Sequence, residues 1–457
     1  MFRTRIKQIV FLTSVAMLLT LFSLPSSSGA IKAGTTCKKA GLQTVDSGRK
    51  YTCIKQGKKF VWNKGVVVKA APAANPSPSA TPSPTPSPSA TPAPTPTPQR
   101  PQLTFIQMLR SGVIDGKFPI EFETYPIPTK LPTSWQDLFE NREGTAYKAW
   151  LSMSKTVATS NSSLGKVNVS VGPNTELPYK DLQSAMSQVS KGFPNTKQPS
   201  TVSVIAFNYT DQMWADDLYR KLIAGESDWF KRMHQEFVIE MCQASRMTCW
   251  SAMGLTNSAG DGIILLGVVE DEMLKRLDPG YSNFARNIQG LTVAHEYFHT
   301  VQRKLMDKNW FQLIYTPPIW FNEATAVYVE NSAMNFASFD KYMRFRAVDS
   351  KLAYPACGSA SQGCVPVTEE IMTNFLSLTH YSTNWQNFPY GMKYEVSLRA
   401  IEVLVALKGH ESITDLYSYM ALNHTFEEAF LKIYGISYSS AIPVLAKIVS
   451  EQFANNR

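Results

Sequence analysis

The order of hydrophobic and polar residues predicts strands first and helices afterwards. Between residues 102 and 268, short apolar runs alternate with stretches of helical periodicity, which is typical of strands connected by helices. We expect strands at residues 166–171, 202–207 and 261–268, and helices near 211–223, 229–241, 391–408 and 425–430. The fold class is therefore expected to be α+β, with a mixed lobe over residues 102–335 and a mainly helical lobe over residues 336–457.

Two segments of different composition come before these lobes. In residues 31–69, apolar residues alternate in short runs bounded by Gly and Lys, which predicts a small module of two or three β-strands. Residues 70–101 hold 12 of the 28 prolines and no charged residue before Arg100. Such a segment cannot bury a core and favours extended polyproline II structure of up to roughly 90 Å, so we expect it to be a linker.

The first thirty residues have the pattern of a secretory signal peptide. Arg3, Arg5 and Lys7 precede an apolar run over residues 9–24, and small residues follow at 28–30. The alternative is an uncleaved membrane anchor, but the run is shorter than the roughly 20 residues that a span requires. We therefore expect cleavage, a secreted protein and no stable membrane span afterwards.

The six cysteines occur as three neighbouring pairs. In an exported chain an even number favours disulfides, and local pairing is the simplest of the fifteen possible connectivities. The pairs expected on this basis are Cys37 with Cys53, Cys242 with Cys249, and Cys357 with Cys364. None of them has the C-x-x-C spacing of a redox motif or a cysteine zinc site.

The excess of positive charge is confined to the start of the chain. The net charge is +9, but residues 31–69 alone contain ten Lys or Arg and only one acidic residue, Asp46. From residue 70 onward, acidic residues outnumber basic ones by three. Nucleic acid is a poor partner for an exported protein, so we expect the basic module to bind an anionic polymer of the cell envelope and to associate the protein with the cell wall.

The strongest chemical motif lies at residues 291–302. His295 and His299 form an H-E-x-x-H run with Glu296. On a helix, positions four apart share a face, so both imidazoles can bind one metal ion. Glu296 lies beside them and can take a proton from water at that metal. The alternative is a helix with two incidental histidines.

A third ligand is needed, because two histidines do not complete a catalytic zinc site. No histidine follows His299 until His380, but residues 318–330 read Pro-Ile-Trp-Phe-Asn-Glu-Ala-Thr-Ala-Val-Tyr-Val-Glu. Here the chain resembles the gluzincin metallopeptidases, which include thermolysin and aminopeptidase N. The resemblance implies a zincin-like lobe in which Glu323 is the third zinc ligand, with Glu330 as an alternative on the same helix. The matching positions are Trp320, Asn322, Ala326 and Tyr328, whereas Ala324 and Thr325 depart from the usual Gly-Phe.

The resemblance continues into the helical lobe. In the family a tyrosine of this region often stabilises the oxyanion, and Tyr390 is the candidate here, with Tyr381 and Tyr394 as alternatives. No G-x-M-E-N segment precedes the metal helix. Since aminopeptidases of the group use that segment to bind a free amine, its absence favours an endopeptidase.

The function expected from these observations is that of a secreted zinc peptidase acting on peptides or proteins. One Zn²⁺ would be held by His295, His299 and Glu323, with Glu296 as general base. The alternative is a catalytically silent cell-surface binding protein on a metalloprotease scaffold.

Overall fold

The computed structural model describes most of the chain from residue 125 onward and the strands of the N-terminal module. The described residues are 34–36, 43–46, 49–57, 59–64, 66–67, 125–177, 179, 181–244, 247–249, 251–269, 289–306, 317–353, 356–357, 364–378 and 386–454. The expected signal peptide and the expected linker lie outside them. The chain divides into two compact units, Met1–Arg100 and Pro101–Arg457.

The first unit contains a small antiparallel sheet. Its strands are β1 (Gln43–Asp46), β2 (Arg49–Gln56), β3 (Lys59–Trp62) and β4 (Val66–Val67). The central strand β2 buries Tyr51 and Cys53, two residues apart, as expected for one face of a strand. Val61 is the buried residue of β3, whereas Phe60 is 36% exposed. The described residues of this unit thus form four strands, whereas the sequence predicted two or three.

The second unit is built around a four-stranded mixed sheet. Its order is β5 (Lys166–Val171), β6 (Thr201–Phe207), β10 (Gly262–Gly267) and β9 (Ala252–Thr256). The first three strands are parallel to one another, and β9 is antiparallel to β10. Strands β5, β6 and β10 lie within one residue of the predicted ranges, whereas β9, with its small residues Ala252 and Gly254, was not predicted.

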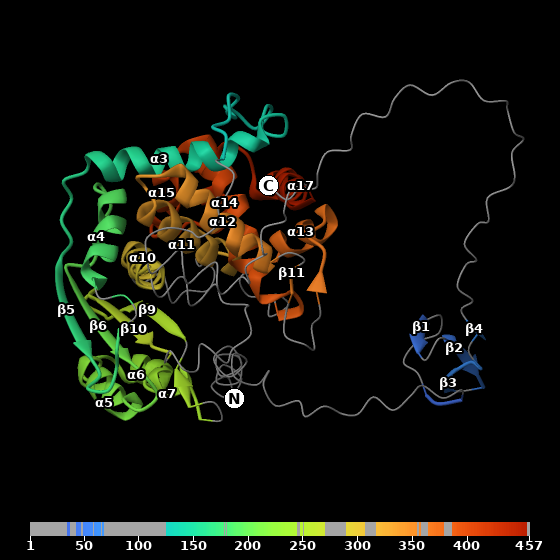
Figure 1. Cartoon of the computed structure of the whole chain (residues 1–457), viewed down its shortest axis with the longest axis horizontal. Coiled ribbons are helices and arrows are strands. Elements are labelled where there is room, and N and C mark those ends of the chain that lie inside the picture. The colour runs from blue at the N-terminus through green and yellow to red at the C-terminus, as the bar shows by residue number, and fades with distance from the viewer. Residues whose placement is uncertain are drawn as a thin grey trace, which may run out of the picture. The chain divides into compact units, whose positions relative to one another are not determined.

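Alternate residues of the central strands enter two different cores. Val202, Val204 and Ala206 of β6 belong to the larger core, whereas Ile205 and Phe207 belong to a smaller one. Figure 1 shows the corresponding helices on opposite faces of the sheet. The larger core is covered by α3 (Thr145–Thr159), α4 (Leu182–Gly192) and α10 (Leu291–Met306), and the smaller one by α5 (Gln212–Leu222), α6 (Asp228–His234) and α7 (Phe237–Glu240).

The C-terminal helices pack on the same larger core, which runs from Leu138 to Phe453. They are α11 (Ile319–Met334), α13 (Glu369–Leu376), α14 (Glu395–Lys408), α15 (Glu411–Met420), α16 (Phe426–Tyr434) and α17 (Tyr438–Ala454). Helix α12 (Phe339–Ala353) instead buries Phe339 and Tyr342 in a separate small cluster with Ala146 of α3. The helix expected over 391–408 is interrupted, because Tyr394 leaves the helical conformation (φ −108°, ψ −95°) after a 3-10 turn, η6 (Tyr390–Lys393). The helix expected over 229–241 is likewise two helices, α6 and α7.

A buried ion pair joins α12 to α14. The Nε atom of Arg346 donates to both carboxylate oxygens of Glu402, at 2.7 and 2.9 Å, and the hydroxyl of Tyr342 donates to Oε1 at 2.7 Å. Both charged side chains are almost completely buried. Removing one partner of such a pair leaves an uncompensated buried charge, so the contact fixes how the two helices pack.

The disulfide Cys242–Cys249 is present and closes the two short strands β7 (Cys242–Gln243) and β8 (Thr248–Cys249), which confirms that predicted pair. Cys357 and Cys364 face each other in the register of β11 (Ala356–Cys357) and β12 (Cys364–Val365). Cys53 is disulfide-bonded, and the predicted partner Cys37 lies outside the described residues.

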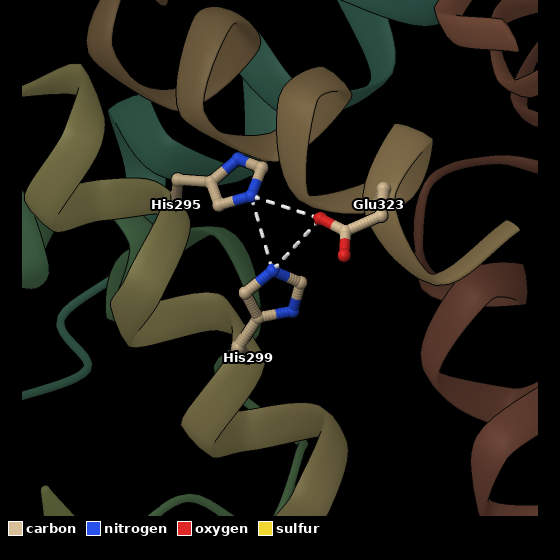
Figure 2. Close-up of side chains that lie close together, drawn as sticks. All are labelled: His295, His299 and Glu323. Atoms are coloured by element: carbon tan, nitrogen blue, oxygen red, sulfur yellow. Dashed lines mark hydrogen bonds and ion pairs between the residues drawn. The ribbon is translucent and has the colours of Figure 1, made fainter. Parts of the chain in front are cut away.

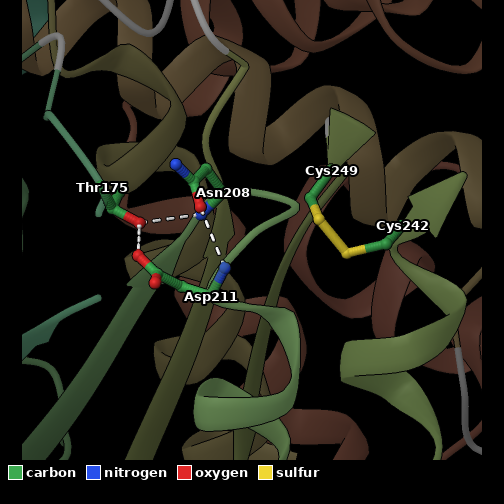
Figure 3. The surroundings of a disulfide bond; sticks show 5 residues. All are labelled: Thr175, Asn208, Asp211, Cys242 and Cys249. Carbon is green, nitrogen blue, oxygen red and sulfur yellow. Dashed lines mark hydrogen bonds between the residues drawn. A yellow bond between two sulfur atoms is a disulfide. The ribbon is translucent and has the colours of Figure 1, made fainter. Parts of the chain in front are cut away.

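A hydrogen-bonded turn lies near the Cys242–Cys249 disulfide, at the carboxyl ends of β5 and β6 (Figure 3). There the carboxylate of Asp211 accepts from the backbone and side chain of Asn174 at 2.8 Å and from the hydroxyl of Thr175 at 2.6 Å. These bonds satisfy the buried carboxylate, so the cluster is explained as a structural one.

Among the described residues, no single helix is long and apolar enough to cross a membrane. Helices α16 and α17 meet that criterion only as a pair, and they are bent by 71° relative to each other.

Candidate metal centre

Helix α10 carries the two histidines of the motif on one face. His295 and His299 are one helical turn apart, and their Nε2 atoms lie 3.0 Å from each other. Both residues are buried, with 4% and 9% of their surface exposed. The helix lies directly against β9, since a Cβ atom on Gly254 would collide with the carbonyl oxygen of Glu296 and lie 3.1 Å from Cβ of His299.

Helix α11 contributes the third group, Glu323. Figure 2 shows its carboxylate pointing at both imidazoles from the neighbouring helix. Its Oε2 atom lies 3.5 Å from Nε2 of His295 and 3.3 Å from Nε2 of His299. Four ligands at tetrahedral angles and about 2.0–2.1 Å from zinc would be about 3.3 Å apart. The three observed separations of 3.0 to 3.5 Å fit such a site.

The other ring nitrogen of His295 is held by Glu330. Nδ1 of His295 lies 3.0 Å from Oε2 of Glu330, whose side chain is fully buried. A carboxylate accepts only, so Nδ1 carries the hydrogen in this contact. In the neutral ring, Nε2 is then the atom with the free lone pair, and it faces Glu323 and His299.

The second histidine has a corresponding partner of different chemistry. Nδ1 of His299 lies 2.6 Å from Oε1 of Gln302, which is fully buried. The amide NH₂ of Gln302 donates to the backbone oxygen of Asn322 at 3.0 Å and to the hydroxyl of Thr325 at 2.8 Å. This assignment of the amide makes Oε1 an acceptor and His299 Nδ1 a donor. Both imidazoles therefore direct a lone pair at the same point.

The electrostatics of the group are those of a site for a cation. Burial alone lowers the pKa of His295, but the charge of Glu330 and the hydrogen bonds with Glu323 and Glu330 outweigh it and raise that pKa to about 9. Burial raises the pKa of Glu323, but its hydrogen bonds with His295 and His299 dominate and hold it well below the usual range. The raised pKa of His295 favours a proton on this imidazole when no metal is bound, and a metal ion would have to replace it.

The residues around Glu323 hold α11 in place. The indole of Trp320 donates to the hydroxyl of Tyr438 on α17 at 3.0 Å, and the hydroxyl of Tyr417 on α15 donates to Oδ1 of Asn322 at 3.1 Å. One turn further on, the hydroxyl of Tyr328 donates to the backbone oxygen of Ala149 on α3 at 2.9 Å. The positions matched in the sequence therefore orient the helix that carries Glu323.

A cluster of aromatic and basic side chains lies beside the metal-binding group. The ring of Tyr394 is 6.2 Å from that of His295, and its hydroxyl is 2.9 Å from the hydroxyl of Tyr390. The ammonium of Lys393 lies 4.6 and 4.8 Å from the ring centres of Tyr390 and Tyr394. Burial, followed by the charge of Glu323, raises the pKa of Tyr394 well above its usual value, so its phenol keeps its proton.

The structure brings together His295, His299 and Glu323, as predicted from the sequence, with Glu296 buried next to them. Among the described residues this is the one group that could hold a metal ion. Tyr390 is 53% exposed and touches the group through Tyr394, while Tyr381 lies outside the described residues. Glu330, considered above as an alternative ligand, instead faces the outer nitrogen of His295.

Three residues of the site were not given their roles by the sequence. Gln302 lies three positions after His299, and Glu330 lies seven after Glu323, so helical spacing alone would place each near its partner. Lys393 carried no such signal. It is 3% exposed, burial lowers its pKa, and Glu323 and Glu395 partly offset that effect.

No protein-family model matches the chain, and comparisons with curated proteins and with solved structures return no match either. The case for a metal centre therefore depends on the geometry of these side chains.

The raised pKa of His295 predicts that metal binding releases a proton. Between the ordinary histidine value of 6.5 and about 9, metal-free His295 is protonated, and zinc must displace that proton. We expect about one proton to be released from His295 near pH 7.5, measured by titration calorimetry in buffers with different heats of protonation. In the metal-free protein, protonation of His295 adds to the free energy of unfolding. This contribution is fully present below pH 6.5 and is lost as the pH rises towards 9.

The matched control for this measurement is Glu330→Gln. It removes the charge that contributes most to raising the pKa of His295. Its proton release near pH 7.5 should be smaller than that of the wild type. Equal proton release in both proteins would contradict the assigned role of Glu330.

Proposed function

We propose that this protein is an exported zinc metallopeptidase of the gluzincin type. The observation that carries the proposal is the convergence of His295 Nε2, His299 Nε2 and Glu323 Oε2 within 3.5 Å, with Glu296 buried on the same helix as the two histidines. Two imidazoles and a carboxylate are the ligands of known catalytic zinc sites, which leave a fourth position for water. The separations of the three atoms favour a small tetrahedral ion over calcium, which takes six or more oxygen ligands.

The proposed chemistry is hydrolysis of a peptide bond. Zinc in this position supplies Lewis acidity, which acidifies water and polarises a carbonyl. Glu296 acts as the general base: its carboxylate takes one proton from the attacking water and passes it to the amide nitrogen as the C–N bond breaks. The two histidines hold their positions throughout, because Glu330 and Gln302 contact their outer nitrogens.

The tyrosine pair supplies the hydrogen bond that the developing oxyanion needs. Tyr394 is closer to His295 than the exposed Tyr390, and its raised pKa keeps the phenol available as a donor. If Tyr390 donates to the hydroxyl of Tyr394, the proton of Tyr394 is left for the substrate oxygen. Lys393 adds positive charge against both rings, which favours negative charge on the substrate.

The substrate is proposed to be an internal stretch of an extended peptide. Within the described residues β9 is an edge of the sheet, and it packs against the helix that carries Glu296. An edge strand can pair with an extended peptide through backbone hydrogen bonds. The strand reads Ala-Met-Gly-Leu-Thr and contains no carboxylate that could bind a free amino terminus, which favours an endopeptidase.

Replacing the proposed base tests the reaction directly. Glu296→Gln should lower kcat by about 10²–10⁴-fold because it removes general-base catalysis, while zinc stays bound. The measurement is cleavage of a peptide library by the full chain, together with metal analysis. Glu427→Gln, which changes an exposed carboxylate on α16, is the matched control and should keep full activity.

Two outcomes would contradict the proposal. One is full activity of Glu296→Gln, and the other is purified wild-type protein that binds no zinc. A zinc-loaded wild type without any peptidase activity would instead support a silent binding protein on this scaffold.

The two tyrosines should differ in their effect on rate. Removing an oxyanion donor costs about 10²–10³-fold in kcat, so Tyr394→Phe should have an effect of this size with little change in KM. Tyr390→Phe should cost less, because its hydroxyl acts through Tyr394. Steady-state kinetics of both variants provide the comparison, and a larger loss for Tyr390→Phe would reverse the assignment.

We also propose that the N-terminal module binds an anionic polymer of the cell envelope. Lys55, Lys59 and Lys64 are all exposed on or beside β2 and β3, and residues 31–69 contain a single acidic residue. In the strand register Lys55 lies opposite the part-exposed Phe60. Ammonium groups next to an aromatic ring suit an anionic polysaccharide, since the ring can pack on a sugar face.

Reversing these charges tests the module in the full chain. The triple variant Lys55→Glu/Lys59→Glu/Lys64→Glu should bind purified cell walls at least tenfold more weakly. Wild-type binding should be lost in about 1 M salt, where the Debye length is about 3 Å. The matched control changes three exposed lysines of the second unit, Lys155, Lys341 and Lys432, to Glu and should bind normally. Equal loss in both variants would contradict a specific role of the module.

A further inference from the structure

We infer that Gln302 is a positioning residue that sets the tautomer of His299 and ties the two metal-binding helices together. The inference rests on the proposed metal site and adds a determinant of its metal affinity. Gln302 is fully buried, is not a metal ligand, and lies one helical turn after His299 on α10.

The contacts of the amide determine which way it faces. Its two N–H groups have two acceptors on α11, the backbone oxygen of Asn322 and the hydroxyl of Thr325. The Thr325 hydroxyl gives its own proton to the same backbone oxygen at 3.0 Å, so it can accept from Gln302. Turning the amide over would place its oxygen against the Asn322 carbonyl oxygen, which has no proton to donate.

This orientation has a direct consequence for His299. The amide oxygen can only accept, so the hydrogen of the neutral imidazole stays on Nδ1, at 2.6 Å from Oε1. The lone pair is then on Nε2, where the metal would bind. The opposite tautomer would place a hydrogen on Nε2, 3.3 Å from Glu323, and would block coordination.

The same amide couples His299 to the position of Glu323. Its two acceptors flank Glu323 in the sequence, at positions 322 and 325, so a shift of α11 relative to α10 would break both hydrogen bonds. Tyr417 holds the side chain of Asn322 from the other side. One side chain on α10 thereby fixes a ligand on its own helix and aligns a ligand on the next.

Charge explains why a neutral amide suits this position. Glu296, Glu323 and Glu330 already bring three carboxylates to the buried site. A fourth would face the Asn322 carbonyl oxygen without a proton between them, and buried charges of one sign repel strongly. His295 is therefore held by a carboxylate and His299 by an amide.

The test compares zinc affinity and histidine tautomer in full-length variants. Gln302→Met keeps the volume of the side chain but removes its hydrogen bonds, and it should weaken zinc binding by about 10–100-fold. Thr325→Val leaves Gln302 in place but removes one acceptor, and it should weaken binding in the same direction. Thr325→Ser keeps the hydroxyl and is the matched control, with wild-type affinity expected.

Nitrogen-15 NMR of histidine-labelled protein separates this role from a purely structural one. The Nδ1 proton of His299 should be a hydrogen-bonded, downfield signal in the wild type and should lose that shift in Gln302→Met. The corresponding signal of His295, held by Glu330, should stay unchanged and reports that the site is still folded. The wild-type signal is expected in metal-free protein as well, so the tautomer is tested whether or not zinc binds.

The outcomes distinguish the two proposals. Wild-type zinc affinity and an unchanged His299 signal in Gln302→Met would overturn the role of Gln302 and leave the peptidase proposal intact. A wild-type protein that binds no zinc but shows the Nδ1 proton of His299 would overturn the peptidase proposal and leave the tautomer assigned to Gln302 intact.

Discussion

The site depends on forcing three electron-pair donors together inside the protein. Two imidazole nitrogens and a carboxylate oxygen lie within 3.5 Å of one another between α10 and α11. Such atoms repel unless a proton or a metal ion lies between them, so the arrangement must be imposed by the surrounding structure. Trp320, Tyr328 and Tyr417 fix α11 against three other helices, and the sheet supports α10 from the opposite side. The packing of the larger core thus keeps the donors in place.

The sequence predicted the elements whose signal is local. Three of the four strands of the mixed sheet were predicted, because β5 alternates valine with polar residues and β6 and β10 contain short apolar runs. The two histidines were placed on one face by their spacing. Strand β9 was missed because its small residues carry no hydrophobic signal. Gly254 has no side chain for a tertiary reason, since a Cβ atom there would collide with the carbonyl oxygen of Glu296 on α10. The interruption at Tyr394 was missed because a single residue that leaves the helix does not change the apolar spacing around it.

The roles of the polar residues in the site were harder to predict than their presence. From the sequence Glu330 was an alternative ligand to Glu323, and only the orientation of α11 shows that it reaches Nδ1 of His295. The sequence favoured Tyr390 over its alternative Tyr394, but Tyr390 is exposed and Tyr394 lies next to an imidazole. Distinctions of this kind depend on the rotation of a helix about its axis, which local periodicity leaves undetermined when all faces are buried. On α11 nearly every side chain is buried, so the sequence contained no polar face from which to infer the rotation.

At Gly254 the sheet contacts the helix that carries the metal-binding histidines, and it does so through the backbone of β9. At Gly254 the backbone of β9 closely approaches the carbonyl group of Glu296, so this main-chain contact limits the distance between strand and helix. A peptide paired with β9 would lie one strand spacing away from it, about 4.8 Å. Its position relative to α10 would then be determined by the position of β9. The depth at which its carbonyl groups lie relative to the metal ligands would then be the same for every sequence bound. If the protein cleaves peptides as proposed, the close approach at Gly254 would let the backbone determine the position of the cleaved bond, and selectivity among substrates would be left to the side chains.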